Sequence, residues 1–211
     1  MAIPRITVLI SGRGSNLSAL IDAERQRALG GTVSAVIGSR ADAPGLAVAA
    51  SHGIATQVVD PRDFVDREAF DAALATAVDE SEPDVVVLAG FMRILGAAFV
   101  RRYEGRMLNI HPSLLPAYPG RDTHRRALAD RARVHGCTVH FVTADVDQGP
   151  IVAQASLDVR EDDDPDSLAA RVLALEHRLL PAAVRAFCEG RLVIEGRQVR
   201  VMERSEPSEI S

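Results

Sequence analysis

Apolar stretches alternate with amphipathic ones along the first half of the chain. Short runs rich in Val, Ile and Leu are typical of strands, and they occur at residues 6–10, 33–37, 56–59, 84–89 and 107–111. Between these runs, apolar residues at helical spacing predict helices at residues 17–29, 44–52, 65–81 and 95–102. This alternation predicts an α/β fold with a doubly wound, mostly parallel sheet of Rossmann type.

The pattern changes after Pro116. Apolar runs at 138–142 and 151–159 predict two further strands, and the short connection between them implies an antiparallel pair. The other elements predicted in this half are a helix at 123–131 and a terminal hairpin with strands at 192–194 and 199–202.

A long helix is predicted from about Pro165 to the region of Gly190, where glycine stands in the usual C-terminal position. Because proline removes a backbone donor, we expect this helix to be interrupted or kinked at Pro181. No linker or repeat breaks the pattern. We therefore expect a single domain over residues 1–204 and a polar tail over 205–211.

Composition narrows the classes of function. The formal net charge of -5 argues against a broad basic surface that tracks nucleic acid. All 24 basic residues are arginine, which excludes a lysine Schiff base and a phosphate loop ending in Gly-Lys. The chain has no apolar run of membrane-spanning length and no signal-like N-terminus, so we expect a soluble, cytoplasmic protein without a membrane partner. Cys137 and Cys188 lack the spacing of a zinc site or a disulfide framework.

Two polar side chains, Asn109 and His111, end the strand predicted at 107–111, and Pro112 stops it. Side chains at i and i+2 of a strand point the same way, so both can act on one reacting group. Asparagine offers an uncharged donor and histidine can move a proton near neutral pH, which suits a reaction that builds charge on oxygen. Two satisfied polar groups at a strand end explain the pair equally well when it is considered alone.

A glycine loop follows the first predicted strand and precedes a helix, and it consists of Gly12, Arg13, Gly14, Ser15 and Asn16. Its backbone N–H groups and the helix dipole predict an anion site. A dinucleotide loop would need a third glycine where Leu17 stands, and an acidic residue would be expected after the second strand, where Ser39 and Arg40 stand. The loop therefore favours a single phosphate.

Two further loops contain candidate residues. The apolar loop that follows the run at 84–89 contains Met92, Arg93, Ile94 and Leu95 and suits a flat ligand bound through backbone groups, although core packing explains it nearly as well. Asp145 and Asp147 lie between the two late strands, where turn carboxylates are usually solvated. Asp147 becomes functional only if it faces His111. Two carboxylates are too few for a hard cation, so no metal is expected.

These segments, in this order, resemble the phosphoribosylglycinamide formyltransferase family, also called GAR transformylases. The resemblance covers residues 6–192 and is carried by Ser11-Gly12-Arg13-Gly14-Ser15-Asn16-Leu17, Val87-Leu88-Ala89-Gly90-Phe91-Met92-Arg93-Ile94-Leu95, Leu108-Asn109-Ile110-His111-Pro112-Ser113-Leu114-Leu115-Pro116, Tyr118-Pro119-Gly120, Asp147-Gln148-Gly149-Pro150 and Glu176-His177. The Asn-x-His-Pro element is shared by other formyltetrahydrofolate enzymes, whereas the glycine loop narrows the resemblance to this family. Arg13 and residues 120–124 are small departures from its pattern.

The resemblance implies a formyltransferase fold and transfer of a formyl group from 10-formyltetrahydrofolate, as co-substrate, to the amine of 5'-phosphoribosylglycinamide in purine biosynthesis. It implies Asn109, His111 and Asp147 as catalytic residues, the first two at the oxygen of a tetrahedral intermediate. Substrate-binding residues implied by the resemblance are Gly12, Arg13, Gly14, Ser15, Asn16 and Glu176. The implied folate-binding residues are Arg67, Met92, Arg93, Ile94, Leu95, Asn109, Ala144, Asp145, Val146 and Asp147.

Three alternatives stay open. Methionyl-tRNA formyltransferases share the Asn-x-His-Pro core but carry an additional C-terminal domain for tRNA, and the acidic net charge also disfavours a tRNA substrate. Formyltetrahydrofolate hydrolases place a regulatory domain before the catalytic one and have no need of a sugar-phosphate loop. A non-catalytic nucleotide-binding module would use the glycine loop alone. The sequence allows a homodimer without predicting one.

Overall fold

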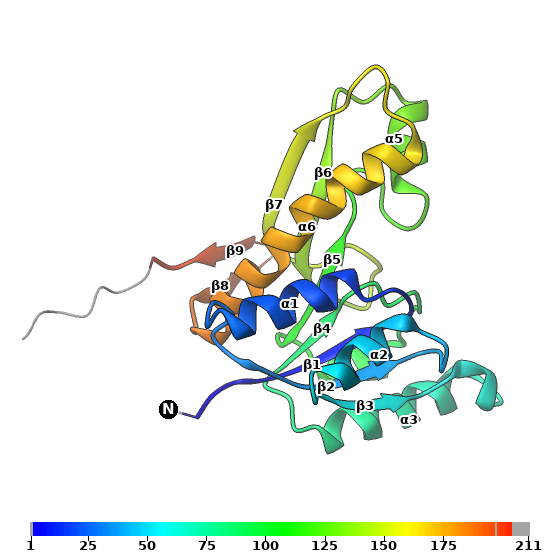
Figure 1. The fold of residues 1–211 in the computed structure, drawn as a ribbon, viewed down its shortest axis with the longest axis vertical. Coiled ribbons are helices and arrows are strands. Elements are labelled where there is room, and N and C mark those ends of the chain that lie inside the picture. The colour runs from blue at the N-terminus through cyan, green and yellow to red at the C-terminus, as the bar shows by residue number, and fades with distance from the viewer. Residues whose placement is uncertain (1, 197, 204–211) are drawn as a thin grey trace, which may run out of the picture.

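One mixed sheet runs through the computed structural model, which describes residues 2–196 and 198–203. Nine strands are ordered β3-β2-β1-β4-β5-β6-β7-β9-β8, so the chain winds outward from β1 in both directions (Figure 1). The predicted doubly wound sheet is confirmed, and so is the late antiparallel strand pair. The polar tail expected at 205–211 lies outside the described residues.

The first half of the chain alternates strands and helices as predicted. Its elements are β1 (Arg5–Ile10), α1 (Ser15–Arg25), β2 (Thr32–Gly38), α2 (Pro44–Ser51), β3 (Ala55–Val58), the 3-10 helix η1 (Pro61–Asp63), α3 (Arg67–Glu80), β4 (Val85–Leu88), α4 (Ala97–Arg102) and β5 (Met107–His111). Strands β1 to β5 pair in parallel with one another. Helix α1 ends at Arg25, four residues before the predicted end, because the chain turns there toward Gly30 and Gly31 ahead of β2.

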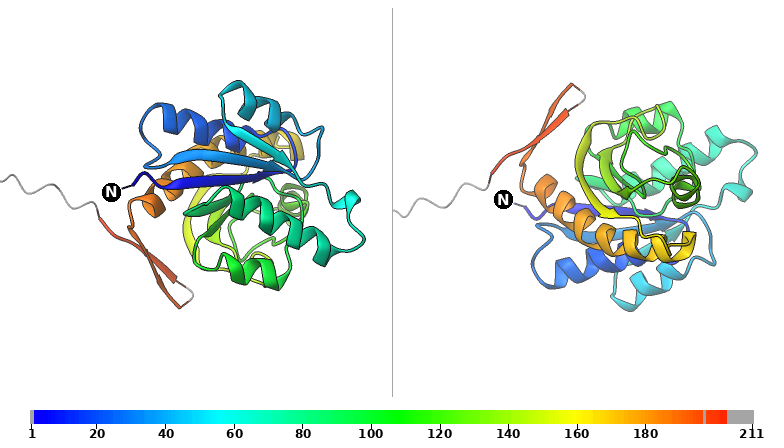
Figure 2. Two further views of the ribbon diagram at one scale, coloured as in Figure 1. Left: turned by 90° about the horizontal axis from the view of Figure 1, so that it is seen from below. Right: turned by 90° about the horizontal axis from the view of Figure 1, so that it is seen from above.

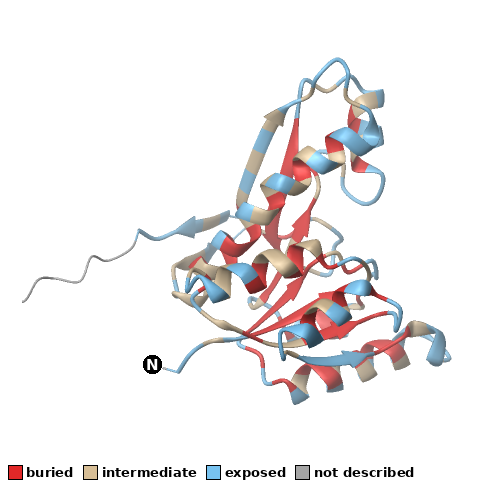
Figure 3. Cartoon of the chain, viewed as in Figure 1, coloured by how far each residue is buried: buried red, intermediate tan, exposed pale blue. Residues whose placement is uncertain are grey.

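Two apolar cores hold helices against opposite faces of the sheet. On one face, α1, α2 and α6 (Pro165–Cys188) pack against the strands through residues such as Leu17, Ala49 and Val184. On the other face, α3 and α4 bury Phe70, Leu74 and Phe99. Strand β4 is buried along its whole length, as its continuous apolar run predicts (Figure 3). The sheet is thus rigid at the place where β4 and β5 end.

The second half extends the sheet as a taller lobe built on β6 (Val134–Phe141), β7 (Ile151–Asp158) and α5 (Thr123–Ala129) (Figure 1). Strand β6 pairs antiparallel with both β5 and β7. It begins four residues earlier than the predicted 138–142 strand, because His135, Gly136 and Cys137 are buried within the ladder. Gly136 passes so close to Ala155 that a β-carbon there would overlap the opposite strand.

Of the interruption or kink expected at Pro181, the interruption is wrong, because helix α6 is continuous through this residue. Its buried stripe includes Leu180 and Val184 on either side of the proline, and packing of this stripe outweighs the missing backbone hydrogen bond. The hairpin predicted at the end of the chain is present as β8 (Leu192–Glu195) and β9 (Gln198–Val201), and it projects from the body of the molecule (Figure 2).

The direction of winding reverses at β1, which lies between β2 and β4. In doubly wound sheets, ligands gather where the loops leave such neighbouring strands in opposite directions. Here the loops that follow β1 and β4 are joined, because the Ser11 N–H donates to the Gly90 carbonyl at 3.1 Å and the Met92 N–H donates to Ser11 Oγ at 2.9 Å. Within residues 2–196 and 198–203, no helix is both long enough and apolar enough to span a membrane.

Candidate active site

A cavity of about 550 Å³ opens beyond the carboxyl ends of β4 and β5. Its apolar wall is the loop after β4, including the predicted residues Met92, Arg93, Ile94 and Leu95. The lining also includes the whole 120–124 segment, Ala144, Val146 and Asp147, together with the polar residues Asn109, His111 and His140. The cavity thus combines an apolar slot with a cluster of polar groups at its base.

The register of two antiparallel strands brings the polar groups together. Asn109 on β5 lies opposite His140 on β6, and His111 lies opposite Thr138. Directly opposed residues of an antiparallel pair share one face of the sheet. The other face carries alternate residues, including Ile110 and Val139, which belong to the core beneath α6. Alternation along both strands therefore separates a reactive face from a packed one.

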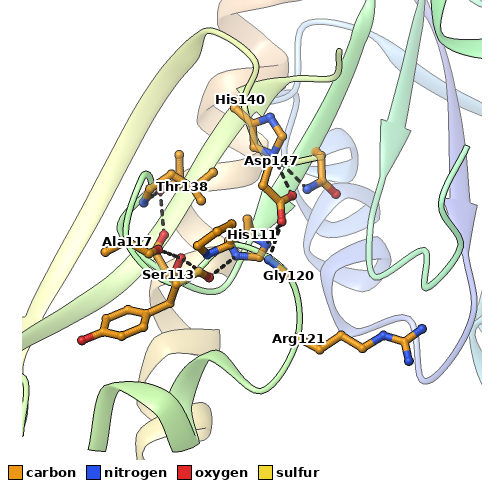
Figure 4. Close-up of polar contacts among 12 residues, drawn as sticks. His111, Ser113, Ala117, Gly120, Arg121, Thr138, His140 and Asp147 are labelled. Atoms are coloured by element: carbon orange, nitrogen blue, oxygen red, sulfur yellow. Dashed lines mark hydrogen bonds and ion pairs between the residues drawn. The ribbon is translucent and has the colours of Figure 1, made fainter. Parts of the chain in front are cut away.

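His111 is 5% exposed, and its two ring nitrogens have different partners (Figure 4). Nε2 lies 3.0 Å from the Tyr118 carbonyl oxygen. A carbonyl only accepts, so Nε2 carries a proton and the neutral ring keeps its lone pair on Nδ1. Nδ1 faces Asp147 Oδ2 at 3.5 Å. Burial lowers the pKa of His111 below its usual value, although the Tyr118 carbonyl and Asp147 act in the opposite direction.

Asp147 is held in place by the backbone of a separate loop. Its Oδ2 accepts the Gly120 N–H at 2.8 Å, and its Oδ1 lies 3.7 Å from His140 Nε2. Burial pushes the pKa of Asp147 upward, but the His140 ring, the Gly120 N–H and His111 outweigh burial, so the pKa lies below the usual value. The carboxylate is thus ionised at neutral pH. The condition set by the sequence, that Asp147 should face His111, is met.

His140 is a site residue that sequence reasoning missed. It is 2% exposed, its Nδ1 lies 2.8 Å from the Phe141 carbonyl oxygen, and its Nε2 lies 3.1 Å from Asn109 Nδ2. The Phe141 carbonyl requires a proton on Nδ1, so neutral His140 accepts from the Asn109 amide through Nε2. The sequence did contain a sign of this role, because Thr138 and His140 on β6 are two residues apart, just as Asn109 and His111 are on β5. Only the register, however, shows that these pairs meet.

The glycine loop forms the N-terminus of α1, where Gly14 has φ 76° and caps the helix without a side-chain contact. A β-carbon at Gly14 would lie 2.7 Å from Gly45 Cα, so both the conformation and the packing require glycine. The backbone N–H groups of the first turn stay available to an anion. The loop does not line the cavity described above. It therefore forms a second, neighbouring part of the site.

Glu176 on α6 meets this second part of the site. Asn16 Nδ2 donates to Glu176 Oε2 at 2.7 Å, and Glu176 is only 7% exposed. Burial raises the pKa of Glu176, although the Asn16 hydrogen bond acts in the opposite direction. The amide nitrogen of Asn16 is thus directed at Glu176, which leaves the amide oxygen as a buried acceptor without a partner among the described atoms.

Two predicted folate-binding residues lie outside the cavity. Arg67 is the first residue of α3, with its Nε 3.7 Å from Asp71 Oδ2, and it is absent from the cavity lining. Asp145 is exposed, and its carbonyl accepts from Thr143 Oγ1 at 3.1 Å. The backbone geometry of each segment determines where these two residues lie. A sequence motif does not specify that geometry.

The cluster can stabilise negative charge and accept a proton at the same place. Asn109 supplies an amide donor, while His111 Nδ1 and the Asp147 carboxylate supply two acceptors directed at each other. Their 3.5 Å separation is long for a direct hydrogen bond and suits a shared N–H donor. Among residues 2–196 and 198–203, no group of three or more His, Cys, Asp or Glu side chains is arranged to hold a metal ion.

Comparison with known proteins places the chain in a family. The family described as formyl transferase matches residues 4–184. The chain is 52% identical over 187 residues to the phosphoribosylglycinamide formyltransferase of Escherichia coli (strain K12), covering 89% of this chain and 88% of that protein. It is also 44% identical over 186 residues to the human trifunctional purine biosynthetic protein adenosine-3, covering 88% of this chain but 18% of that protein.

The fold agrees with a solved structure over nearly the whole chain. The crystal structure of glycinamide ribonucleotide transformylase 1 from Symbiobacterium toebii has a TM-score of 0.93 and 50% sequence identity, and the match covers 95% of each chain. The resemblance predicted from the glycine loop and the Asn-x-His-Pro element is confirmed. The chain belongs to the formyl transferase family.

Proposed function

We propose that this enzyme transfers a formyl group from 10-formyltetrahydrofolate to the amine of 5'-phosphoribosylglycinamide, a step of purine biosynthesis. The likeness to enzymes with that name over most of the chain supports this function. The observation that carries the proposal is the His111–Asp147 pair, set beside Asn109 at the base of an apolar cavity. The apolar slot suits the flat pterin ring, and the N-terminus of α1 suits the sugar phosphate.

Formyl transfer begins when the substrate amine attacks the formyl carbon and the carbonyl electrons move onto oxygen. The second N–H of the Asn109 amide donates to this oxygen, because the first is taken by His140. Removing one such donor typically costs about 3 to 4 kcal/mol of barrier. His140 thereby acts as a positioning residue that aims the amide nitrogen, and not the amide oxygen, at the developing charge.

The attacking nitrogen must lose a proton as the intermediate forms. His111 Nδ1 and Asp147 Oδ2 are both acceptors in the unliganded protein, and an N–H between them satisfies both. Once Nδ1 takes the proton, His111 becomes a cation that donates to the oxyanion. The intermediate then reforms its C=O bond, the bond to folate nitrogen N10 breaks, and the proton passes to that nitrogen, directly or through water.

The second part of the site would select the sugar phosphate. Backbone N–H groups of Gly12 to Asn16 bind the phosphate, and Glu176 with Asn16 Oδ1 accepts from ribose hydroxyls near the amine. Arg67 and Arg93 would meet the anionic tail of folate at the edge of the cavity. Asp145 remains a folate contact by resemblance alone, because it does not line the cavity.

The decisive experiment compares two formyl acceptors. Purified protein should formylate phosphoribosylglycinamide only when 10-formyltetrahydrofolate is supplied, and it should leave methionyl-tRNA unmodified under the same conditions. Release of formate without an acceptor would instead identify a hydrolase. Tight NAD binding without folate dependence would identify a nucleotide-binding module. A single domain over residues 1–204 and a cytoplasmic location are further parts of this proposal, which limited proteolysis and cell fractionation can check. Sedimentation would distinguish a monomer from the homodimer that the sequence allows.

A further inference from the structure

The turn that follows β5 is held by three polar side chains with no place in the reaction described above. They are Ser113 on the turn itself, Thr138 on β6 and Gln154 on β7. Thr138 lies opposite His111 in one ladder and opposite Gln154 in the next, so His111, Thr138 and Gln154 form a row across β5, β6 and β7. Figure 4 shows Thr138 and Ser113 beside His111. The row stands next to the Asn109–His140 pair, two residues further along the same strands.

Thr138 is the centre of this row and is fully buried. Its Oγ1 donates to the Ser113 carbonyl at 2.7 Å and accepts from the Leu115 N–H at 3.0 Å. Gln154 Nε2 donates to Thr138 Oγ1 at 2.9 Å and to the Leu115 carbonyl at 2.8 Å. Three of these hydrogen bonds join Thr138 or Gln154 to the backbone of Ser113 or Leu115, and the fourth joins Gln154 to Thr138. The hydroxyl and the amide therefore serve the turn alone.

Ser113 connects this turn to His111. Its side chain is fully buried, and its Oγ lies 2.6 Å from the Ala117 carbonyl oxygen and 3.2 Å from the Tyr118 carbonyl oxygen. The Tyr118 carbonyl is the same group that accepts from His111 Nε2 at 3.0 Å. The direction of one carbonyl thus depends on the turn, and that carbonyl fixes which nitrogen of His111 carries the proton.

We propose that Ser113, Thr138 and Gln154 are positioning residues that set the tautomer of His111 through the Tyr118 carbonyl. With this carbonyl in place, the proton is on Nε2 and the Nδ1 lone pair faces Asp147 and the substrate amine. If the turn relaxes, the opposite tautomer becomes accessible, and its Nδ1–H donates to the Asp147 carboxylate and blocks the acceptor. This inference rests on the proposed function for its catalytic meaning, but the tautomer itself does not depend on which amine is formylated.

The experiment replaces Thr138 by valine, which keeps the shape and removes the hydroxyl, and by serine, which keeps the hydroxyl. Thr138→Val should lower kcat at least tenfold and leave KM for both substrates within about twofold, while Thr138→Ser should keep most of the activity. The matched control is Thr7→Val, since Thr7 is also fully buried and its Oγ1 pairs with Ser81 Oγ at 2.5 Å far from the cavity. This control should lose stability without losing kcat.

A spectroscopic readout separates positioning from general destabilisation. Nitrogen-15 NMR of the unliganded protein, with the His111 signals assigned by their loss in His111→Gln, should show the Nε2–H tautomer in the wild type. Thr138→Val or Ser113→Ala should shift the population toward Nδ1–H. The acid limb of the kcat/KM profile should move to lower pH by about half a unit, because a weaker Tyr118 contact no longer supports the protonated ring.

Three results would overturn the inference. They are a wild-type His111 with its proton on Nδ1, a Thr138→Val variant with unchanged tautomer and kcat, and a Thr138→Ser variant as slow as Thr138→Val. If Thr138→Val does not fold, Gln154→Met and Ser113→Ala carry the same test. Absence of formyl transfer by the wild type would refute the proposed function alone, since the tautomer is measured without substrate.

Discussion

Two carboxyl groups, half-buried Asp147 and buried Glu176, differ in their surroundings and therefore in the direction of their pKa shifts. Asp147 receives the Gly120 N–H and lies beside His111 and His140, and its pKa is lowered. Glu176 has the Asn16 amide as its hydrogen-bond donor, and burial raises its pKa. Both side chains lie near the edge of the sheet where ligands are expected.

The difference shows how one fold assigns separate roles to similar groups. A carboxyl beside a backbone N–H and two imidazole rings has a lowered pKa and can take part in proton transfer, whereas a buried carboxyl paired with a side-chain amide has a raised pKa and suits hydrogen bonding to a ligand. This difference supports the proposed assignment of Asp147 to the reacting centre and of Glu176 to the substrate site. The following predictions test this division, beginning with the largest effect.

Matched amide substitutions should separate the two carboxyl groups by activity. Asp147→Asn removes an acceptor at the reacting centre and should lower kcat at least about a hundredfold. Glu176→Gln keeps the shape and most hydrogen-bonding capacity, so it should mainly raise KM for the sugar phosphate, by about tenfold. Steady-state kinetics with each substrate varied in turn measures both effects. Similar kcat losses in the two variants would remove the distinction between them.

The same two variants should respond to pH in opposite ways. Glu176 has a raised folded pKa, so its burial costs nothing below its unfolded value of 4.5 and lowers stability as the pH rises above it. Glu176→Gln should therefore gain stability over the wild type as the pH increases from about 4.5 to 8. Asp147 has a lowered folded pKa, so it stabilises the protein above its unfolded value of 3.8, and this contribution disappears as the pH falls through the folded pKa.

Denaturant titrations between pH 3.5 and 8 can measure these slopes. For Asp147→Asn, the loss of stability relative to the wild type should be full at neutral pH and should shrink toward acid pH. For Glu176→Gln, the gain should be absent at the acid end. Parallel curves for both variants, with no dependence on pH, would show that neither carboxyl changes its pKa on folding.

The sequence predicted the parallel half of the molecule better than the antiparallel half. The strand, glycine loop and helix around Gly14 are contiguous, so local pattern and turn chemistry were sufficient to predict an anion site. The partners of Asp147 are His111, Gly120 and His140, which come from three separate segments, and neither Gly120 nor His140 could be assigned to it from the sequence alone. The motif identified Asn109, His111 and Asp147 by resemblance, but their protonation depends on burial and on backbone donors that no motif encodes.

The continuity of α6 was missed for a related reason. A proline inside a helix predicts a break from local chemistry, yet the buried stripe that includes Leu180 and Val184 keeps the helix intact. Glu176, five residues before Pro181, therefore reaches Asn16 from a continuous helix. Tertiary packing thus determines the position of Glu176, which local propensity would leave undetermined.

The smallest predicted effect concerns the backbone-built part of the site. Ser15→Ala removes one hydroxyl from the first turn of α1 and leaves the backbone N–H groups in place, so KM for the sugar phosphate should rise about three- to tenfold, as expected for one hydrogen bond of about 1 kcal/mol. The value of kcat and the KM for folate should not change. Gly14→Ala is the informative contrast, because its β-carbon would meet Gly45 Cα at 2.7 Å and should reduce stability as well as phosphate binding. If Ser15→Ala lowered kcat as strongly as Asp147→Asn, the phosphate loop and the reacting centre would have to be treated as one coupled unit.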